Sequence, residues 1–252
     1  MPMAAPTKDN IEYKSPEIER FYREHRTRWE DFYESERVVF KRLGLDESTS
    51  VLDIGCGCGG LGLALKERFG VTRYTGVEIN AQAAEAAKEV CPWGRFLAAD
   101  ILAPPPGSLA IGSFDVVVSL SCIDWNIRFD DMLAAAYAYV RKGGQFVSSF
   151  RITTGSSEID VRRSFQHINF DGKKEGEVAP YVVLNTADLV TRLTALAPQR
   201  IGGYGYWGHP SPSAVTPFSA IGFVVVAVEK GGAPSKKPIV ELDLPADLLP
   251  SS

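Results

Sequence analysis

Four glycines and two cysteines crowd into ten residues of the chain, VLDIGCGCGG at positions 51–60. A glycine-rich turn between a strand and a helix lets the backbone approach a ligand and offers it the unpaired N–H groups of the helix. Gly55, Gly57 and Gly59 form a G-x-G-x-G motif, which suggests a methyl donor. Counting Gly60 instead of the third glycine gives G-x-G-x-x-G, which suggests a nicotinamide hydride carrier. The glycines alone leave both chemistries open.

Three acidic residues that end successive predicted strands favour the methyl donor. Asp53 precedes the first glycine by two positions, in an otherwise apolar strand where a buried carboxylate needs a partner. It would repel a pyrophosphate but attract the ammonium and sulfonium of S-adenosylmethionine (SAM); hydrogen bonding to the loop backbone is its alternative role. Glu78 can accept both ribose hydroxyls of either cofactor. Asp100 can accept the exocyclic amine of adenine, with Ile79 and Ile101 packed against the ring.

The two cysteines inside the loop are not expected to add chemistry of their own. Cys56 and Cys58 could bind a soft metal, but no second Cys or His cluster lies near them in the sequence to complete a tetrahedral site. The other two cysteines, at 91 and 122, lack the spacing of a disulfide framework. We interpret the loop cysteines as small residues in a cramped turn, and we expect no bound metal.

The elements that must position these residues alternate along the chain after Gly44. Apolar runs predict strands, and amphipathic runs between them predict helices, which indicates a parallel sheet with helices on both faces. The last two strands are joined by a loop instead of a helix, so we expect an antiparallel pair at one edge. The predicted fold is α/β, a doubly wound, mostly parallel seven-stranded sheet with a reversed edge strand. The expected strands are 50–55, 73–79, 94–100, 114–120, 143–150, 200–207 and 220–230, and the expected helices between them are 61–70, 80–91, 129–140 and 186–197.

These motifs, in this order, resemble those of the class I SAM-dependent methyltransferases. After VLDIGCGCG, the similar motifs are GVEIN at 76–80, FLAAD at 96–100, FDVVVSL at 114–120 and VRKGGQFVSS at 140–149. The strand pair near 200–229 agrees with the reversed seventh strand of that family. The resemblance implies SAM as the cofactor. The residues that it implies will contact SAM or line the floor beneath it are Asp53, Gly55, Cys56, Gly57, Glu78, Ile79, Asp100, Ile101, Ser119 and Leu120.

Candidate catalytic residues follow the fourth and fifth strands and lie in the polar segment 153–180, an insertion of the kind that often carries function. Asp124 could position or deprotonate a methyl acceptor, or cap the next helix. Beside it, Trp125 could wall the pocket or belong to the core. Arg151 could bind an acidic acceptor or be a solvated residue at a strand end. His167 could act as a general base, because imidazole titrates near neutrality, or be structural.

The N-terminal part of the chain is predicted to form a helical extension, with one bent helix or two over Pro16–Leu43. We expect it to close as a lid over the SAM pocket, with Tyr13 or Trp29 touching the donor. Packing in the core is the alternative for Trp29. The expected boundaries are 1–47 for the extension, 48–230 for the SAM-binding domain with its acceptor-side insertion 153–180, and 231–252 for a flexible tail.

The composition indicates a soluble, cytoplasmic protein whose partner is a small molecule. Hydrophobic residues make up 45% of the chain, the net charge is −4, and the sequence pI is about 5.5. An acidic chain is a poor match for nucleic acid, which requires a concentrated basic surface. No apolar run approaches the ~20 residues that span a bilayer. We therefore expect methyl transfer from SAM to an oxygen or nitrogen of a small-molecule acceptor, with a homodimer as the candidate assembly.

Two other functions fit parts of the sequence. An NAD(P)-dependent oxidoreductase would explain the G-x-G-x-x-G spacing and Glu78, but not Asp53, and no Tyr-x-x-x-Lys catalytic pair is evident. A non-catalytic SAM-binding protein would retain the donor loop and lose the acceptor chemistry.

Overall fold

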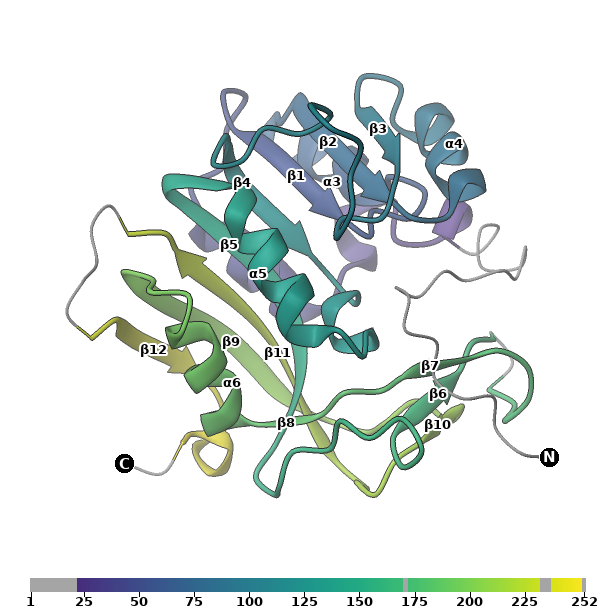
Figure 1. Cartoon of the computed structure of the whole chain (residues 1–252), viewed down its shortest axis with the longest axis vertical. Helices are drawn as coiled ribbons and strands as arrows, with labels where there is room; N and C mark the ends of the chain where they lie inside the picture. The colour runs from purple at the N-terminus through teal and green to yellow at the C-terminus, as the bar shows by residue number, and fades with distance from the viewer. Residues whose placement is uncertain (1–21, 170–171, 232–236, 251–252) are drawn as a thin grey trace.

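The structure is a computed structural model that describes residues 22–169, 172–231 and 237–250. Its main element is a nine-stranded sheet with helices on both faces, and a separate three-stranded sheet lies beyond one end (Figure 1). The large sheet consists of β1 (Ser50–Ile54), β2 (Arg73–Glu78), β3 (Arg95–Ala98), β4 (Phe114–Ser119), β5 (Val140–Thr153), β8 (Leu184–Asn185), β9 (Arg200–Gly208), β11 (Ile221–Glu229) and β12 (Ile239–Asp243). Their order is β12-β9-β11-β5-β4-β1-β2-β3, with β8 paired to β5 outside this path. The predicted doubly wound α/β fold is confirmed.

The central strands are buried on both faces, as in parallel sheets that helices cover on each side. All five residues of β1 are buried, and β1 pairs in parallel with β2 and with β4. Leu52 and Ile54 belong to one hydrophobic core and Val51 to the other, because successive side chains of a strand point to opposite faces. This packing fixes β1 and places the glycine loop at the carboxyl edge of the sheet.

Helices cover the two faces in pairs. On one face, α5 (Phe129–Tyr139) and α6 (Thr186–Thr194) contribute to the core that contains Leu52. On the other, α2 (Glu34–Arg42) and α3 (Gly60–Phe69) contribute to the core that contains Val51. The remaining helix, α4 (Ala81–Val90), packs beside β3. Within the described ranges, no helix is both long and apolar enough to cross a membrane.

The reversed strand differs in position from the prediction. β11 is antiparallel to both of its neighbours, β5 and β9, so it lies inside the sheet and not at the edge. The edge strand is β12, which pairs in parallel with β9. Residues 239–248 were expected in a flexible tail, but they form β12 and the 3-10 helix η3 (Ala246–Leu248). The sequence GGAPSKKP at 231–238 is typical of a linker, but it carries no information on the sheet pairing of the residues that follow it.

Leu248 anchors this C-terminal segment to the sheet. Its side chain is 1% exposed, and it packs over Gly222 of β11 so closely that a Cβ on that glycine would lie 2.7 Å from the leucine Cδ1. We expect Leu248→Ala to lower the free energy of unfolding by about 2–4 kcal/mol, the usual effect of truncating a buried leucine. The adjacent Leu249, 43% exposed, provides the control, because Leu249→Ala should change stability by less than about 0.5 kcal/mol. Equal effects of the two substitutions in urea unfolding would contradict the anchoring role.

The N-terminal extension is not one continuous helix. Residues 22–24 are helical, the backbone turns at Arg26 with φ of 59°, and the 3-10 helix η1 (Trp29–Asp31) precedes α2. Asp31 accepts the N–H groups of Thr27 and Arg28, which stabilises the turn between the helical pieces. Apolar spacing alone does not reveal this break. Tyr22 before it packs against a small cluster that includes Cys58, and Trp29 after it packs in the core that contains Val51.

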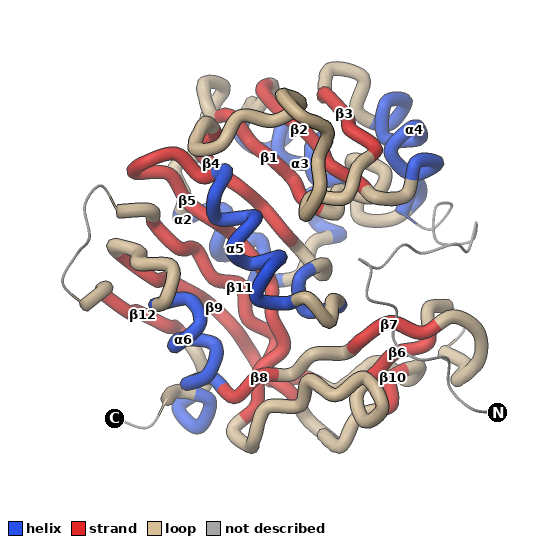
Figure 2. Tube along the Cα trace, viewed as in Figure 1, coloured by secondary structure: helices blue, strands red, loops and turns tan. Residues whose placement is uncertain are grey.

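The polar insertion contains strands that the sequence did not indicate. β6 (Phe165–His167) and β7 (Val178–Pro180) pair with each other, and β6 also pairs with β10 (Ala214–Val215), which comes from the connection between β9 and β11. Figure 2 shows this small sheet set apart from the large one. Two segments distant in sequence therefore build one structural unit, which we call the roof sheet.

Candidate functional site

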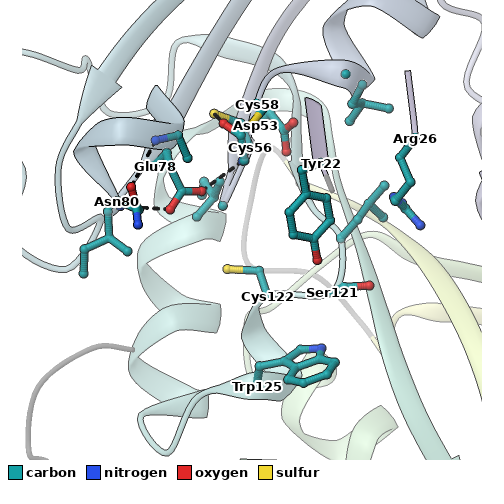
Figure 3. A pocket seen from close by; sticks show the side chains of 18 of the residues that line it. Tyr22, Arg26, Asp53, Cys56, Cys58, Glu78, Asn80, Ser121, Cys122 and Trp125 are labelled. Carbon is teal, nitrogen blue, oxygen red and sulfur yellow. Dashed lines mark hydrogen bonds between the residues drawn. The ribbon is translucent and has the colours of Figure 1, made fainter. Parts of the chain in front are cut away.

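A cavity of about 630 Å³ lies at the carboxyl edge of the large sheet, a volume that is ordinary for small-molecule sites. One part of its wall comes from the glycine loop and the ends of β1 and β2. The other part comes from residues 22–33, the 3-10 helix η2 (Ile123–Trp125) and the roof sheet (Figure 3). The residues anticipated from sequence that line it are Asp53, Gly55, Cys56, Gly57, Glu78, Ile79, Ile101, Leu120 and Trp125.

The glycine loop adopts conformations and contacts that favour glycine. Gly55 and Gly57 have φ of 73° and 52°, both in the left-handed region. A Cβ on Gly55 would lie 2.7 Å from the Sγ of Cys122, and a Cβ on Gly57 would contact the ring of Tyr22. The loop can therefore form one wall of the cavity only because these positions carry no side chain.

Asp53 is a buried carboxylate in the cavity wall. It is 4% exposed, and one of its oxygens accepts a hydrogen bond from the hydroxyl of Tyr74. Burial raises the pKa of Asp53 to about 7; the Tyr74 hydrogen bond opposes this change, and the charge of Glu78 adds to it. Because the burial of this charge is unfavourable, a cationic ligand beside Asp53 would be bound strongly.

Glu78 connects the end of β2 to the glycine loop. One carboxylate oxygen accepts the N–H of Gly57 at 2.9 Å, and the other accepts the N–H of Asn80 at 3.0 Å (Figure 3). Asn80 in turn caps α4, accepting the N–H groups of Gln82 and Ala83. The carboxylate is thus held in a fixed orientation at the cavity wall.

Asp100 and Ser119, two further predicted contacts, are not among the residues that line the cavity. Asp100 follows β3, and its Oδ1 accepts the N–H of Leu102 at 2.9 Å. Ser119 is fully buried at the end of β4. Their neighbours Ile101 and Leu120 do reach the cavity and present apolar surface to it.

Burial favours the protonated form of two thiols that line the cavity, those of Cys56 and Cys122. Burial raises the pKa of Cys122 to about 12 and that of Cys56 well above its ordinary value. Among the described residues, no group of three or more His, Cys, Asp or Glu side chains is arranged to hold a metal ion.

The N-terminal segment closes one side of the cavity. Tyr22, His25 and Arg26 line it, and the guanidinium of Arg26 forms an ion pair at 2.8 Å with Glu36, whose side chain is 1% exposed. The carbonyl oxygen of Arg26 lies directly over Gly60, where a Cβ would stand 2.2 Å from it. The absence of a side chain at Gly60 therefore permits the close approach of this segment to the start of α3.

Of the two aromatic residues expected to touch the donor, Trp29 does not line the cavity. Trp29 packs in the core against the rings of Phe40 and Phe69, at centroid distances of 6.4 and 5.2 Å, and does not line the cavity. Trp29 is therefore in the hydrophobic core, which was the alternative position considered for it. Tyr13 lies outside the described residues.

Asp124 and Arg151, both predicted catalytic residues, form a buried pair outside the cavity lining. Their side chains approach to 3.4 Å, and Arg151 also donates to the Asp124 carbonyl oxygen at 3.0 Å. The guanidinium lies 4.3 Å from the ring centroid of Trp125 and 3.7 Å from that of Tyr181. Burial raises the pKa of Asp124 to about 6, and Arg151 opposes this change. The pair supports Trp125 and does not itself reach the cavity.

His167 also lies outside the cavity lining, because successive side chains of a strand point to opposite faces. It is the last residue of β6, and its neighbours Gln166 and Ile168 both line the cavity. His167 contacts the ring of Phe165 edge-on, and its Nδ1 is buried without a hydrogen-bond partner among the described residues. The polar side chain that β6 presents to the cavity is therefore Gln166.

Several cavity residues were missed by reasoning from the sequence. The polar insertion signalled a functional segment, but only its pairing as strands determines which of its side chains reach the cavity. The N-terminal extension was expected to cover the pocket, but its helical apolar pattern gave no signal for the residues that line the cavity, Tyr22, His25 and Arg26. The missed lining residues with polar or aromatic side chains include Tyr22, His25, Arg26, Asn80, Cys122, Asn126, Gln166 and Asn169.

The central part of the chain is similar in sequence to known methyltransferases. A family model described as a methyltransferase domain matches residues 51–144. The chain is 27% identical over 132 residues to trans-aconitate 2-methyltransferase of Paracidovorax citrulli, covering 52% of this chain and 47% of that protein. It is also 27% identical over 132 residues to malonyl-[acyl-carrier protein] O-methyltransferase of Enterobacter lignolyticus, covering 52% and 50%. The chain spans about half the length of the curated relatives it matches.

Solved structures share the fold. Phosphoethanolamine N-methyltransferase 2 of Haemonchus contortus, in complex with S-adenosylhomocysteine, superposes with a TM-score of 0.54 at 15% identity, covering 77% of this chain and 52% of that one. A possible histamine N-methyltransferase of Thermotoga maritima superposes with a TM-score of 0.51 at 21% identity, covering 84% and 98%.

Proposed function

Because the chain belongs to the class I SAM-dependent methyltransferases, we propose that it transfers the methyl group of SAM to an oxygen or nitrogen atom of a small-molecule acceptor. The observation that carries this proposal is the continuity of the cavity, which joins the glycine loop to polar and aromatic side chains of η2, β6 and the N-terminal segment. A protein that only binds SAM would need the glycine-loop side of the cavity but not the polar and aromatic side chains opposite it. SAM, when bound, supplies a methyl group activated on its sulfonium, and the chain aligns the reactants and excludes water.

The residues of the glycine-loop side fit SAM. Asp53 is a buried carboxylate with a pKa of about 7, and a cationic ligand beside it would lower that pKa. This supports placing the ammonium group of the methionine part of SAM beside Asp53. The glycine loop leaves open a cradle that side chains would fill. Glu78 presents a carboxylate suited to the ribose hydroxyls, and Ile79 and Ile101 present apolar surface suited to adenine.

We assign the acceptor side to positioning and not to a side-chain base. Asp124 and His167 lie outside the cavity lining, and Arg151 is paired with Asp124. A correctly oriented acceptor with a free lone pair gains rate from proximity, and a dry cavity prevents competing hydrolysis. The N-terminal segment around Tyr22 and Arg26 acts in this scheme as the lid that encloses both reactants.

Calorimetry with SAM, S-adenosylhomocysteine and NAD tests the proposal. We expect the first two to bind with similar affinity and NAD not to bind, because Asp53 would repel its pyrophosphate. Tight NAD binding in the absence of SAM binding would overturn the assignment. Incubation with SAM and a metabolite extract, followed by mass spectrometry, then tests turnover. SAM binding without any product gaining a methyl group would favour a non-catalytic SAM-binding protein.

SAM affinity should depend on pH through Asp53. The ligand-free protein holds Asp53 protonated below its pKa of about 7, and the ionised form binds the cation. The dissociation constant for SAM should therefore fall about 10-fold between pH 6 and pH 8, since the cost of removing that proton disappears above the pKa. Asp124→Asn is the control, because Asp124 also titrates near this range, at a pKa of about 6, yet lies outside the cavity lining. Loss of the pH dependence in that variant would contradict the assignment to Asp53.

A further inference from the structure

Resting on the proposed methyl transfer, we infer that the acceptor is an uncharged, planar ring compound that lies against Trp125 and carries both a hydrogen-bond acceptor and a hydrogen-bond donor. Figure 3 shows the indole of Trp125 across the cavity from Tyr22, with Cys122 and Ser121 between them in this view. Three independent observations lead to this class of compound: two unpartnered polar atoms, a rigid aromatic wall, and the balance of charge around the cavity.

Two buried polar atoms in residues that line the cavity have no hydrogen-bond partner among the described residues. They are Nε1 of Trp125, a donor, and Oδ1 of Asn169, an acceptor. The amide of Asn169 is fixed in orientation, because its Nδ2 donates to the carbonyl oxygens of Lys173 and Glu175 at 2.7 and 3.2 Å. Buried polar groups in folded proteins are almost always paired, so a ligand with complementary atoms is the simplest partner for both.

Arg151 and Tyr181 pack against the indole ring of Trp125 and hold it in place. The Arg151 guanidinium lies 4.3 Å from its ring centroid, and Tyr181 packs edge-on at 5.9 Å. Arg151 is itself 4% exposed and paired with Asp124, so this cation cannot swing into the cavity without leaving a buried charge unpaired. A preorganised indole favours a flat partner, because little side-chain entropy is lost on binding.

The charge around the cavity disfavours an anionic acceptor. The carboxylates among the described lining residues are Asp31, Asp53 and Glu78, and the basic side chains are His25 and Arg26. Arg26 is already neutralised by the buried Glu36, as Arg151 nearby is by Asp124. The described wall therefore offers no unpaired arginine fork of the kind that binds carboxylates, which a di- or tricarboxylate acceptor would need.

Calorimetry of acceptor binding to the protein saturated with S-adenosylhomocysteine tests the inference. The probes are catechol, 4-hydroxyquinoline and hypoxanthine as uncharged rings, and trans-aconitate as a tricarboxylate. We expect at least one of the rings to bind and to become methylated in the presence of SAM, and trans-aconitate not to bind. Binding of trans-aconitate, or failure of all three rings to bind at millimolar concentration, overturns the inference. Failure of S-adenosylhomocysteine to bind would instead overturn the proposed function, so the two failures are distinguishable.

Substitution of the indole separates a positioning role from a structural one. Trp125→Phe keeps a ring and removes the N–H, so the dissociation constant of the ring compound and its KM should rise roughly 3- to 10-fold while SAM binding is unchanged. Trp93→Phe is the matched control: Trp93 also has an unpartnered Nε1 and a cation, Lys66, 3.7 Å from its ring centroid, but it lies outside the cavity. Equal acceptor affinities of the Trp125→Phe variant and the unmodified protein would overturn the inference.

Discussion

Replacing Asp53 by asparagine should weaken SAM binding about 100-fold, the scale of losing a charge-assisted hydrogen bond in a buried site. The carboxamide keeps the shape of the side chain and can still accept the hydroxyl of Tyr74, so the change is confined to the charge that faces the cavity. With the carboxylate gone, the pH dependence of SAM binding between pH 6 and 8 should disappear as well.

The same substitution should make the ligand-free protein more stable at pH 8. In the folded state the pKa of Asp53 is about 7, above the 3.8 of an unperturbed carboxyl, so ionising it costs folding free energy. That cost is absent below pH 3.8, grows as the pH rises towards 7, and is constant above it. Asp53→Asn should therefore raise the free energy of unfolding at pH 8 by about 1–4 kcal/mol, with little effect near pH 4.

Urea unfolding at several pH values and calorimetry with SAM measure the two effects together. Glu85→Gln is the control for removing a negative charge, because Glu85 is exposed on α4 with a side chain 71% accessible. It should change neither SAM affinity nor stability beyond about 0.5 kcal/mol. A variant at Asp53 that binds SAM normally would refute its role, whatever its stability.

Adding a single methyl group at Gly60 should lower the methyl-transfer rate about 100-fold. The Cβ of Gly60→Ala would stand 2.2 Å from the carbonyl oxygen of Arg26, so the N-terminal segment must move away from the loop. Because that segment carries Tyr22 and Arg26 on the cavity wall, its displacement opens the cavity to water and misaligns the reactants. Misplacement by about 1 Å can reduce a rate about 10²-fold.

Gly202→Ala provides the matched control for this substitution. Gly202 lies in β9, and the nearest atom to a Cβ placed there is 3.9 Å away, an ordinary contact. The rate at which methylated product forms, measured in a discontinuous assay, should be normal for this variant. Deletion of residues 1–26, which leaves the core residue Trp29 in place, should reproduce the effect of Gly60→Ala if the segment acts as a lid. Normal turnover of Gly60→Ala would show that the contact with Arg26 is not needed.

The glycine-loop side of the cavity was largely predictable from the sequence because its residues are adjacent to strand ends. A parallel strand such as β1 is an uninterrupted apolar run, so an acid within it, like Asp53, stands out. Strand order then brings Glu78 beside the glycine loop with no further information. The same argument failed for Asp100, because turns after strands can direct a side chain to the local backbone instead of the cavity.

The acceptor side was less predictable because it depends on pairing between segments far apart in sequence. His167 and Gln166 are adjacent and both polar, and only the orientation of β6 decides which of them lines the cavity. Asp124 and Arg151 are each suited to catalysis by type, yet they neutralise each other across 27 residues of sequence. The predicted antiparallel pair of β9 and β11 was confirmed. Its place inside the sheet was not predicted, because β12 covers the outer edge of β9 and follows a segment whose sequence is typical of a linker.

The interior position of β11 has a consequence for the order in which the chain can fold during synthesis. Among the described strands, β9 pairs with β11 and β12, both of which follow it in the chain, and β11 is the one that links it to β5, so β9 cannot join the sheet until β11 has left the ribosome. Until then the 14-residue strand β5 is largely without its partner on that side and presents an open edge. Such edges recruit other chains. Synthesis of β11 and β12 therefore separates a nascent chain whose glycine loop is already formed from one in which β5 and β9 have their partners.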